Sequence, residues 1–498
     1  MKLWFLVSFL LLTLLQPVQP APSATQPLRV VHAPYFANRI DWGTAAIFWF
    51  GRADVANGVA PIPGRNYADV RVAYTSSDLH VFVSVIDYYL WHEYNPNTSS
   101  NPTSYDYDGV ALYLDINGDR TTAPGTDDYV FLAKWGASGE EYSQPYQRQA
   151  RGNGSAWNTA WNGSWRHLPG AQWSCNPGPN SNDCGLDFGW AVTFRIPWQT
   201  IGLSAPPHGR TMGMGMQLFD RDAPGSSGVA PVQTWPETLT TTRPDTWGGL
   251  ALGPATMNIP LSRVEGTTTI RRGLPGSNVI DASVGDDGNC NGGHEGNPDS
   301  PIKPGSNPPI TRGEDTSLWV AGQSGITDFP CFARAYLRFG LDQIPPGKTI
   351  ISARLIITHW SQSGDSNSPN PDDRPQPSFI QLFTVDPDWT ETGVTWNNGP
   401  LARRNYGGVT VTPRNPREPL FPGVPYSWDA TIAVAEAYAA GTPLNIALYT
   451  AAEPMHTSKY LHSSEAGDFV NEARPTLIVT WGTPVEVRSR VFLPLLSR

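Results

Sequence analysis

The chain has 498 residues and a formal net charge of −10, with 34 Lys and Arg against 44 Asp and Glu. Because the few basic residues are scattered and form no stripe, the sequence excludes nucleic acid and anionic membranes as partners. The 48 Gly, 48 Pro and 19 Trp, with few runs of Ala, Leu, Glu and Lys, favour strands and turns over helices and predict an all-β protein.

Residues 1–24 predict a secretory signal peptide. Lys2 precedes an apolar run from Leu3 to Leu15, and the small residues Ala21 and Ala24 mark the expected cleavage region. The run is shorter than the roughly 20 apolar residues that a membrane span needs, and no later segment approaches that length. We therefore expect a secreted protein, extracellular or at the cell surface, without a transmembrane segment.

The next part of the chain, residues 25–254, predicts one β-rich domain. Its strand signals alternate with period two and are separated by turn residues such as Asn117-Gly118-Asp119. The segments are Asp69–Tyr74, Leu79–Val85, Val110–Asp115, Tyr129–Leu132, Ala191–Trp198 and Met212–Phe219. The alternation fades after residue 254, so we place a linker at 255–267.

Residues 268–483 predict a second β-rich domain. Its strand segments are Ala335–Phe339, Ala353–Thr358, Phe379–Val385, Leu444–Tyr449 and Thr476–Trp481. One short helix is expected at Thr431–Ala440, where Ala, Val and Glu replace Gly and Pro. The stretches Asp286–Pro309 and Ser361–Pro377 are rich in Pro, Asn, Asp and Ser and predict long exposed loops.

Four cysteines predict two disulfides in an exported chain, where thiols normally oxidise. Proximity favours Cys175 with Cys184 and Cys290 with Cys331, one bridge in each half, although four cysteines allow three pairings. No Cys-x-x-Cys pair is present, which argues against a structural zinc site or a redox motif.

The first domain resembles carbohydrate-binding module family nine and its wider DOMON-like relatives. The resemblance rests on Ala68–Tyr74, Leu79–Asp87, Tyr105–Asp115, Phe194–Trp198 and Pro244–Gly248. The family holds a sugar between two aromatic faces above an acidic residue. The first aromatic position falls on Tyr105, but the acidic position falls on Ala111 and the second aromatic position on or near Thr241, so two of the three elements are missing.

The second domain resembles the DNRLRE domain, which is allied to carbohydrate-binding module family ninety-six. The resemblance rests on Arg338–Leu341, Ile344–Gly347, Ala353–Leu355, Asp388–Glu391, Val394–Asn398 and Ala473–Leu477. Both families imply jelly-roll-like sandwiches that accompany enzymes acting on polysaccharides. We therefore expect two antiparallel β-sandwich domains in tandem.

Aromatic residues elsewhere in the first domain could replace the missing clamp. Trp157, Trp161 and Trp165 cluster with Trp173 in a Gly- and Asn-rich stretch, and Trp235 precedes the loop before Trp247. We predict that Tyr105 and one or more of Trp157, Trp161, Trp165 and Trp235 stack on a glycan. The alternative is that these rings fill the core, because Trp buries well where its N–H finds an acceptor.

An acidic hairpin in the first domain predicts a calcium site. The candidate ligands are Asp115, Asn117, Asp119, Asp127 and Asp128, grouped around a Gly turn, and hard Ca²⁺ prefers oxygen ligands of this kind. The run lacks the Glu that closes an EF-hand loop. The alternative is an ordinary turn, since Asp and Asn favour turns by themselves. In the second domain, acidic residues near Cys290, including Asp281, predict solvated acidity more than a second calcium loop.

Catalytic motifs are missing from the sequence. Asp220 and Asp222 are near neighbours, but a glycosidase needs two acids about 5 to 10 Å apart across a cleft. No nucleophile elbow, zinc helix or phosphate loop is present. We predict a non-catalytic protein that binds polysaccharide or cell-wall glycan.

Two other functions remain open at this point. One is a structural surface or spacer protein. The other is a haem-binding DOMON-type electron-transfer protein, in which Met212, Met214 or Met216 would supply a sulfur ligand, although three Met on one strand face more simply fill a core. The C-terminal segment 484–498 predicts either an export or surface tag or an edge strand folded back on the second domain.

Overall fold

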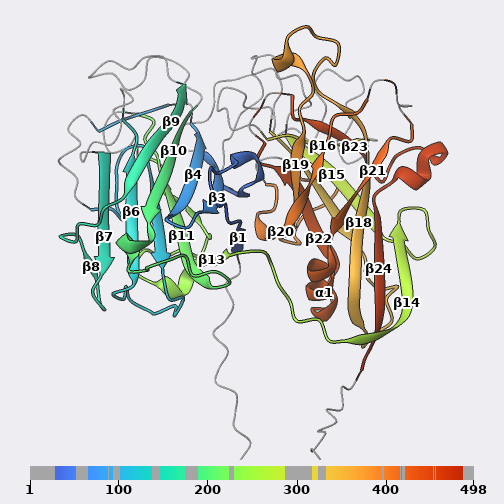
Figure 1. Ribbon diagram of the computed structural model, residues 1–498, viewed down its shortest axis with the longest axis horizontal. Coiled ribbons are helices and arrows are strands. Elements are labelled where there is room, and N and C mark those ends of the chain that lie inside the picture. Colours follow the sequence, from blue (N-terminus) through green and yellow to red (C-terminus); the bar gives the residue numbers. More distant parts are fainter. Residues whose placement is uncertain are drawn as a thin grey trace, which may run out of the picture.

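A computed structural model describes most of the chain (Figure 1). The described residues are 29–51, 66–87, 89–93, 101–136, 146–173, 189–223, 229–285, 317–322, 332–394, 398–415, 417, 421–452, 454 and 456–485; of 170–173 the backbone alone is described. The predicted signal peptide, the four cysteines and nearly all of the predicted tail lie outside these residues. Among the described residues no helix is long and apolar enough to cross a membrane.

The first half of the chain folds into a sandwich of two mainly antiparallel sheets. One sheet has the order β2 (Ala46–Gly51), β3 (Tyr67–Tyr74), β4 (Asp78–Ile86), β10 (Gly189–Pro197) and β9 (Arg166–Trp173). The facing strands are β1 (Val30–Ala33), β13 (Gly248–Leu252), β11 (Thr211–Phe219), β5 (Gly109–Asp115), β6 (Asp128–Lys134), β7 (Gln147–Gly152) and β8 (Trp157–Asn158), with β12 (Gln233–Trp235) beside β11.

The second half forms another sandwich. One layer has the order β15 (Val279–Gly285), β17 (Ala333–Phe339), β22 (Leu444–Thr450), β19 (Ser378–Val385) and β20 (Ala402–Val411). The other has the order β14 (Ser262–Arg271), β24 (Thr476–Pro484), β18 (Thr349–Gln362), β23 (Lys459–His462) and β16 (Ser317–Val320), with β21 (Val424–Asp429) beside β18. The predicted helix is present as α1 (Thr431–Ala439).

Each sandwich has its own apolar core, because side chains alternate between the two faces of a strand. In the first, Phe48, Val70 and Val81 face Leu112 and Phe131. In the second, residues from β17, β19 and β22 face residues from β18, β23 and β24, and Ala433 and Val434 of α1 close the core. The predicted all-β architecture of two sandwiches in tandem is therefore confirmed.

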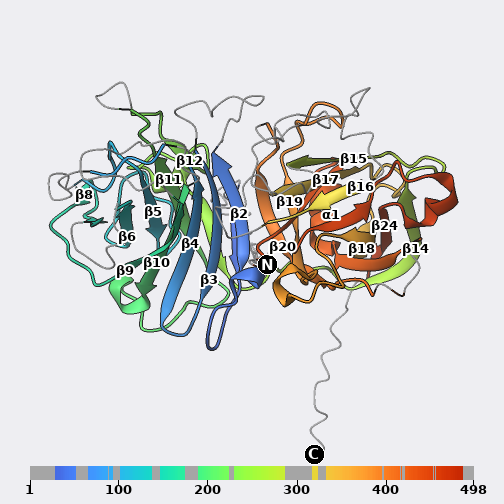
Figure 2. The same cartoon turned by 90° about the horizontal axis from the view of Figure 1, so that it is seen from above.

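A third apolar cluster joins the two sandwiches. Seen from above, they lie side by side with β2 facing β19 and β20 (Figure 2). Ile47 and Trp49 of β2 pack in one buried cluster with Phe383 of β19 and with Ala447 and Tyr449 of β22. β2 is buried on both faces, since Phe48 belongs to the first core while Ile47 and Trp49 belong to this interface.

Polar contacts reinforce the interface. The Tyr449 hydroxyl donates to the buried Asp69 carboxylate at 2.6 Å, and Gln381 Nε2 donates to the Ala45 carbonyl at 2.7 Å. The Arg334 guanidinium lies over the Trp49 ring, 4.4 Å from its centroid. Strand β1 also bridges the halves, because it pairs with β13 and touches β20 through Val30 and Arg404. One sheet thus continues from the first sandwich into the second.

The segment between the sandwiches is shorter than the predicted linker. Strand β14 begins at Ser262 and pairs along its length with β24, so residues 262–267 belong to the second sandwich. These residues escaped strand prediction because most of β14 is partly or fully exposed, and the strand therefore has no strong alternation of apolar and polar residues.

Candidate functional site

An aromatic cluster covers the outer face of the β5–β6–β11 layer. Tyr105, Tyr113, Phe219 and Trp247 are buried there together with Ala111, and Tyr107, Trp157 and Leu239 pack on them from outside. The Tyr113 ring centroid lies 5.3 Å from that of Trp247 and 6.1 Å from that of Trp157. This face is therefore apolar and aromatic although it lies outside the main core.

Three of the predicted stacking residues are buried. Tyr105, Trp165 and Trp235 are 4%, 4% and 1% exposed. Trp165 lies nearly parallel to Phe194 in the main core, and the centroid of Trp235 lies 4.3 Å from that of Phe48. Trp165 and Trp235 therefore fill the core, and Tyr105 is buried in the outer aromatic cluster. This corrects their expected place on a binding surface, because a ring enclosed on both sides has no free face for a sugar.

The other two candidates are partly exposed but do not lie on one surface. Trp157 joins the outer aromatic cluster, where it lies parallel to Trp247 with centroids 6.3 Å apart. Trp161 packs on the edge of the main core, with its centroid 5.1 Å from that of Tyr129. Trp157 is thus the predicted residue that combines partial exposure with a place on the outer aromatic face.

Two side chains lie beside the positions of the missing clamp elements. The Trp157 indole N–H donates to the Thr241 carbonyl at 3.0 Å, so a ring from another part of the chain lies beside the position of the second aromatic. Directly across the sheet from Ala111, Gln217 accepts a hydrogen bond from Tyr113. The sequence did not point to Gln217 as a candidate, because only the pairing of β5 with β11 places it opposite Ala111.

The predicted calcium residues converge at the end of β5. One oxygen each of Asp115, Asp119 and Asp127 lies within 4.8 Å of the others. Asp115 accepts hydrogen bonds from the backbone N–H groups of Gly118 (2.8 Å) and Arg120 (3.0 Å), which fix its carboxylate in the loop. The oxygen-only set fits Ca²⁺.

The two other predicted calcium residues have different places in this loop. The Asn117 side chain donates to Asp119 at 3.2 Å and thus orients a candidate ligand. Asp128 accepts from the Gly125 N–H at 2.6 Å, and burial raises its pKa to about 8.

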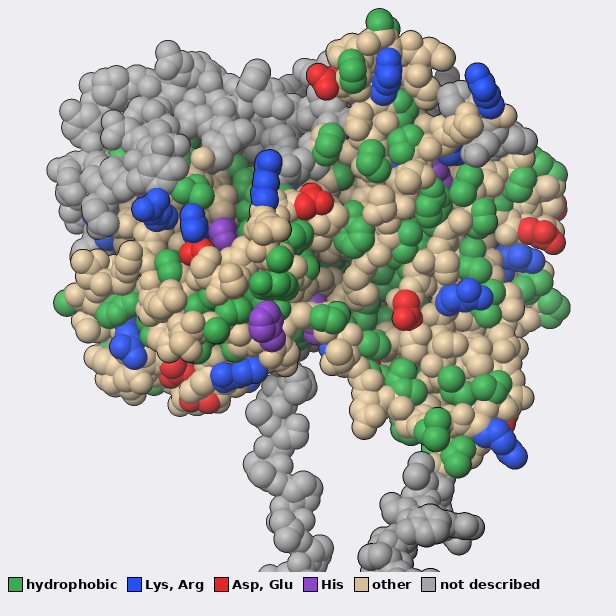
Figure 3. Space-filling view, viewed as in Figure 1, with side chains coloured by type: hydrophobic (Ala, Val, Ile, Leu, Met, Phe, Trp, Pro, Cys, Tyr) green, Lys and Arg blue, Asp and Glu red, His purple; other side chains and the backbone are tan. Residues whose placement is uncertain are grey.

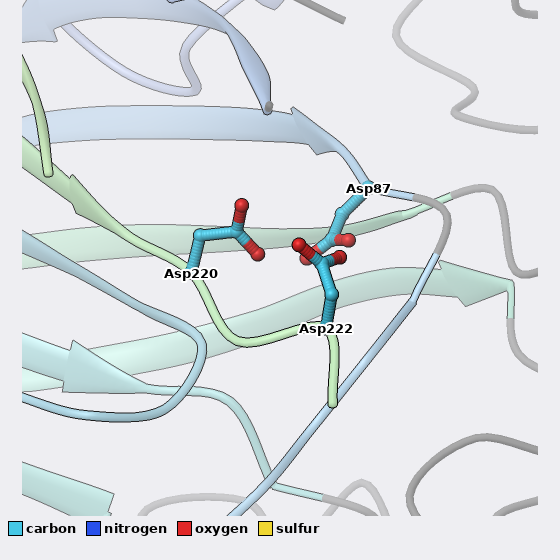
Figure 4. A group of neighbouring side chains, drawn as sticks. All are labelled: Asp87, Asp220 and Asp222. Carbon is cyan, nitrogen blue, oxygen red and sulfur yellow. The ribbon is translucent and has the colours of Figure 1, made fainter. Parts of the chain in front are cut away.

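A second group of carboxylates was not predicted as a site. Asp87 follows β4, Asp220 and Asp222 follow β11, and the three side chains point toward one another (Figure 4). One oxygen of each lies within 4.8 Å of the others. Neither oxygen of the buried Asp220 has a hydrogen-bond partner of normal geometry. Burial, and then the neighbouring carboxylates, hold the pKa values of Asp87, Asp108 and Asp220 well above the usual range.

Backbone and amide donors orient Asp87 of this group and its buried neighbour Asp108. Asp87 accepts from the Tyr89 N–H at 3.0 Å and from Asn66 Nδ2 at 3.1 Å, and Asp108 accepts from the Arg221 N–H at 2.9 Å. Buried carboxylates this close need either protons or a cation. Asp220 and Asp222 are near neighbours in the sequence, but only the fold shows that Asp87 lies beside them.

A third acidic group, in the second sandwich, already has a cation among its members. Asp281, Glu391 and Glu465 lie close together, and Arg272 forms ion pairs with both glutamates. The guanidinium supplies the positive charge that a metal would bring, so this group is a structural ion-pair cluster.

The three methionines of β11 are core residues. Met212, Met214 and Met216 are buried between the sheets of the first sandwich. Their packing accounts for their alternate spacing and gives no support to the haem alternative.

Two family models match the chain. Residues 42–254 match the family described as Carbohydrate family 9 binding domain-like, and residues 295–480 match Carbohydrate-binding module family 96. These matches confirm both predicted resemblances and their order along the chain. No curated protein matches the chain.

Among solved structures, the chain is similar to a family 9 carbohydrate-binding module from Caldicellulosiruptor kristjanssonii in complex with cellotriose. The identity is 18% and the TM-score 0.29, and the match covers 47% of this chain and 100% of that one. A structure of a family 9 module from the same organism in complex with glucose matches with 18% identity and a TM-score of 0.29, covering 46% of this chain and 99% of that one.

Proposed function

We propose that the chain, whose successive parts match a family 9-like and a family 96 carbohydrate-binding model, is a secreted, non-catalytic protein that binds polysaccharide or cell-wall glycan. The observation that carries the proposal is the tandem of two carbohydrate-binding families. The predicted signal peptide supports export. Few charged side chains appear on the face in Figure 3, and they are scattered, which suits an uncharged, hydroxyl-rich partner better than a highly charged one.

In the first module, we propose that glycan binds next to Trp157. Its indole lies on the outer aromatic cluster, and a partly exposed ring offers a flat apolar face to the C–H groups of a pyranose. The Thr241 carbonyl accepts from the indole N–H and holds the ring in this place. Trp161, on a different part of the module, is a second stacking candidate.

Binding can be tested by native electrophoresis in gels that contain xylan or alginate, and by sedimentation with insoluble cellulose or peptidoglycan. We expect retention on at least one glycan, and we expect Trp157→Ala to weaken it about tenfold, as for a central aromatic contact. Trp481→Ala, which removes a partly buried ring of the second module, is the matched control. Absence of retention on every glycan would sink the proposal, and release of reducing ends would contradict the non-catalytic part.

We further propose that Ca²⁺ binds the first module at the Asp115–Asp119–Asp127 group and at the Asp87–Asp220–Asp222 group. The second group supports the proposal more strongly, because Asp220 is buried with two oxygens that lack ordinary partners. A bound ion would neutralise these carboxylates and stabilise the ends of β4, β5 and β11. Its contribution is therefore to the fold of the module and not to a chemical step.

Calcium removal should lower the melting temperature. An ion whose free concentration is about 100 times its dissociation constant adds ~2.7 kcal/mol to the free energy of unfolding when it binds only the folded state. We expect Asp119→Asn and Asp220→Asn each to remove part of the difference between melts in Ca²⁺ and in chelator, and the double variant to remove most of it. A melting temperature that is the same in Ca²⁺ and in chelator would contradict both sites.

A further inference from the structure

One end of the second core is basic. Strands β18 and β23 carry the core residues Ile357 and Leu461, and Leu461 is the cross-strand partner of His359. Lys459 lies two residues before Leu461 on β23, so the alternation of side chains places it on the same inward face. His359 and Lys459 are both 0% exposed. We call these two residues, together with the 9% exposed Arg414, the buried basic cluster.

The members of the buried basic cluster act on one another. The Arg414 guanidinium donates to the carbonyl of Trp360, the residue after His359. Burial first, and then the positive charges of Lys459 and Arg414, lower the pKa of the His359 imidazole to about 3. The imidazole is therefore neutral near pH 7 and has one N–H to donate.

No carboxylate in the described part of the chain balances the charge of Lys459. Its ammonium donates to the Gln376 carbonyl at 2.6 Å and to the Thr457 carbonyl at 2.9 Å, and burial alone lowers its pKa to about 7. The acidic residues of the preceding loop, Asp365 and Asp373, are exposed and accept hydrogen bonds within that loop. An ammonium has three protons, so Lys459 can donate one more hydrogen bond.

Other polar groups beside the cluster are buried and have no hydrogen-bond partner of normal geometry among the described residues. They are both ring nitrogens of His359 and the hydroxyls of Ser363 and Thr457. Thr457 lies beside Lys459, since its carbonyl accepts from the ammonium. The Ser363 N–H donates to the Ser458 carbonyl at 3.2 Å, next to the start of β23. Buried polar groups in folded proteins nearly always have a partner, so these groups indicate a ligand.

The chemistry of these groups favours an anion. An ammonium, an imidazole N–H and two hydroxyls can all donate hydrogen bonds, whereas a metal ion needs acceptors and would meet two positive charges. A water molecule can accept these hydrogen bonds but cannot offset a buried positive charge, which is costly to leave without a counter-charge. Because His359 and Lys459 are fully enclosed, the anion must be small.

We propose that one small inorganic anion, such as chloride, binds between Lys459, His359 and the hydroxyl of Thr457. The anion offsets the charge of the ammonium and accepts hydrogen bonds from donors that the protein itself does not use. It therefore stabilises this end of the second core. The site is structural and does not depend on the proposed glycan binding, so each proposal can fail without the other.

The first test measures the melting temperature of the full chain while sodium chloride replaces sodium methanesulfonate at constant ionic strength and constant calcium. We expect a rise of roughly 1–2 °C for each tenfold increase in chloride above its dissociation constant. Lys459→Met removes the ammonium but keeps the length of the side chain, and it should make the melting temperature independent of chloride. Lys348→Met, which removes a lysine of the same module that pairs with Glu265 at 2.6 Å, is the matched control and should keep the dependence.

A second test does not require that a variant folds. Crystals of the unchanged protein grown in sodium bromide should give an anomalous diffraction peak beside the Lys459 ammonium. An ordered water in that place without an anomalous signal overturns the proposal and assigns the donors to water. A melting temperature of the unchanged protein that does not respond to chloride overturns it as well, and so does a response that survives in Lys459→Met, because the anion then acts elsewhere.

Discussion

Asp281 is a buried carboxyl group whose charge state should govern part of the pH dependence of stability. Its Oδ2 accepts a hydrogen bond from the Ser464 N–H at 2.7 Å, while Oδ1 is buried without a partner. Burial raises its pKa to about 7. Because the folded state holds this proton more tightly than the unfolded chain does, its contribution to stability is present below about pH 4 and is lost as the pH rises through 7.

Replacing Asp281 by Asn should remove this pH dependence, because the amide keeps the shape of the side chain but cannot ionise. We expect Asp281→Asn to gain stability relative to the unchanged protein between pH 4 and pH 8, by up to a few kcal/mol. Thermal melts of both proteins at several pH values provide the comparison, and the difference between them cancels the effects of the other buried acids. Parallel pH profiles would contradict the assignment to Asp281.

Residue identity alone did not distinguish partly exposed rings from core rings. Trp157, Trp161 and Trp165 lie close together in sequence, yet Trp157 joins the outer aromatic cluster and Trp165 joins the core. The clustering of Asp115, Asp119 and Asp127 could be predicted because these residues are close in sequence, whereas Asp87 and Asp220 meet only after β4 and β11 take their places.

At the scale of elements, strand β1 holds the two modules together. It pairs in parallel with β13, and its outer edge meets Asn405 of β20: the His32 N–H donates to Asn405 Oδ1 at 2.7 Å, and Asn405 Nδ2 donates to the His32 carbonyl at 3.1 Å. Arg29, just before β1, donates to the Ala402 carbonyl at 3.0 Å and pairs with Asp386.

Asn405→Ala should therefore destabilise the whole chain. The substitution leaves a backbone N–H and a carbonyl of β1 without partners in a largely buried place, at a cost of about 1–3 kcal/mol. Asn471→Ala, at an exposed position of the second module, is the matched control. Denaturant unfolding measures both variants, and equal stability of the two would contradict the bridging role of β1.

Strands with one buried and one more exposed face could be predicted from their alternation, as for β18 and β24. β2 could not, because its run of apolar residues has no alternation: one face belongs to the first core and the other to the interface. The continuous run Ala46–Phe50 is, in retrospect, the mark of a strand covered on both sides. The sequence thus indicates that both faces of β2 are covered, but only the structure shows that the second module covers one of them.

At the scale of the whole molecule, the buried interface fixes the two modules relative to each other. The site proposed at Trp157 therefore keeps a constant orientation relative to the second module. If both modules bind glycan, they would hold a long polysaccharide more tightly together than either does alone, provided that one chain, or two neighbouring chains, can reach both.

Rigid docking predicts that the modules unfold together. We expect one calorimetric transition for the full chain, since unfolding either module exposes the apolar cluster that contains Trp49, Ala447 and Tyr449. Ala447→Arg places a charge in this buried cluster and should split the transition in two, because the modules then separate before either unfolds. Thr410→Arg, at an exposed position on β20, adds the same charge without touching the interface and should keep the single transition. Two transitions in the unchanged protein would show that the modules unfold independently and would contradict the rigid docking.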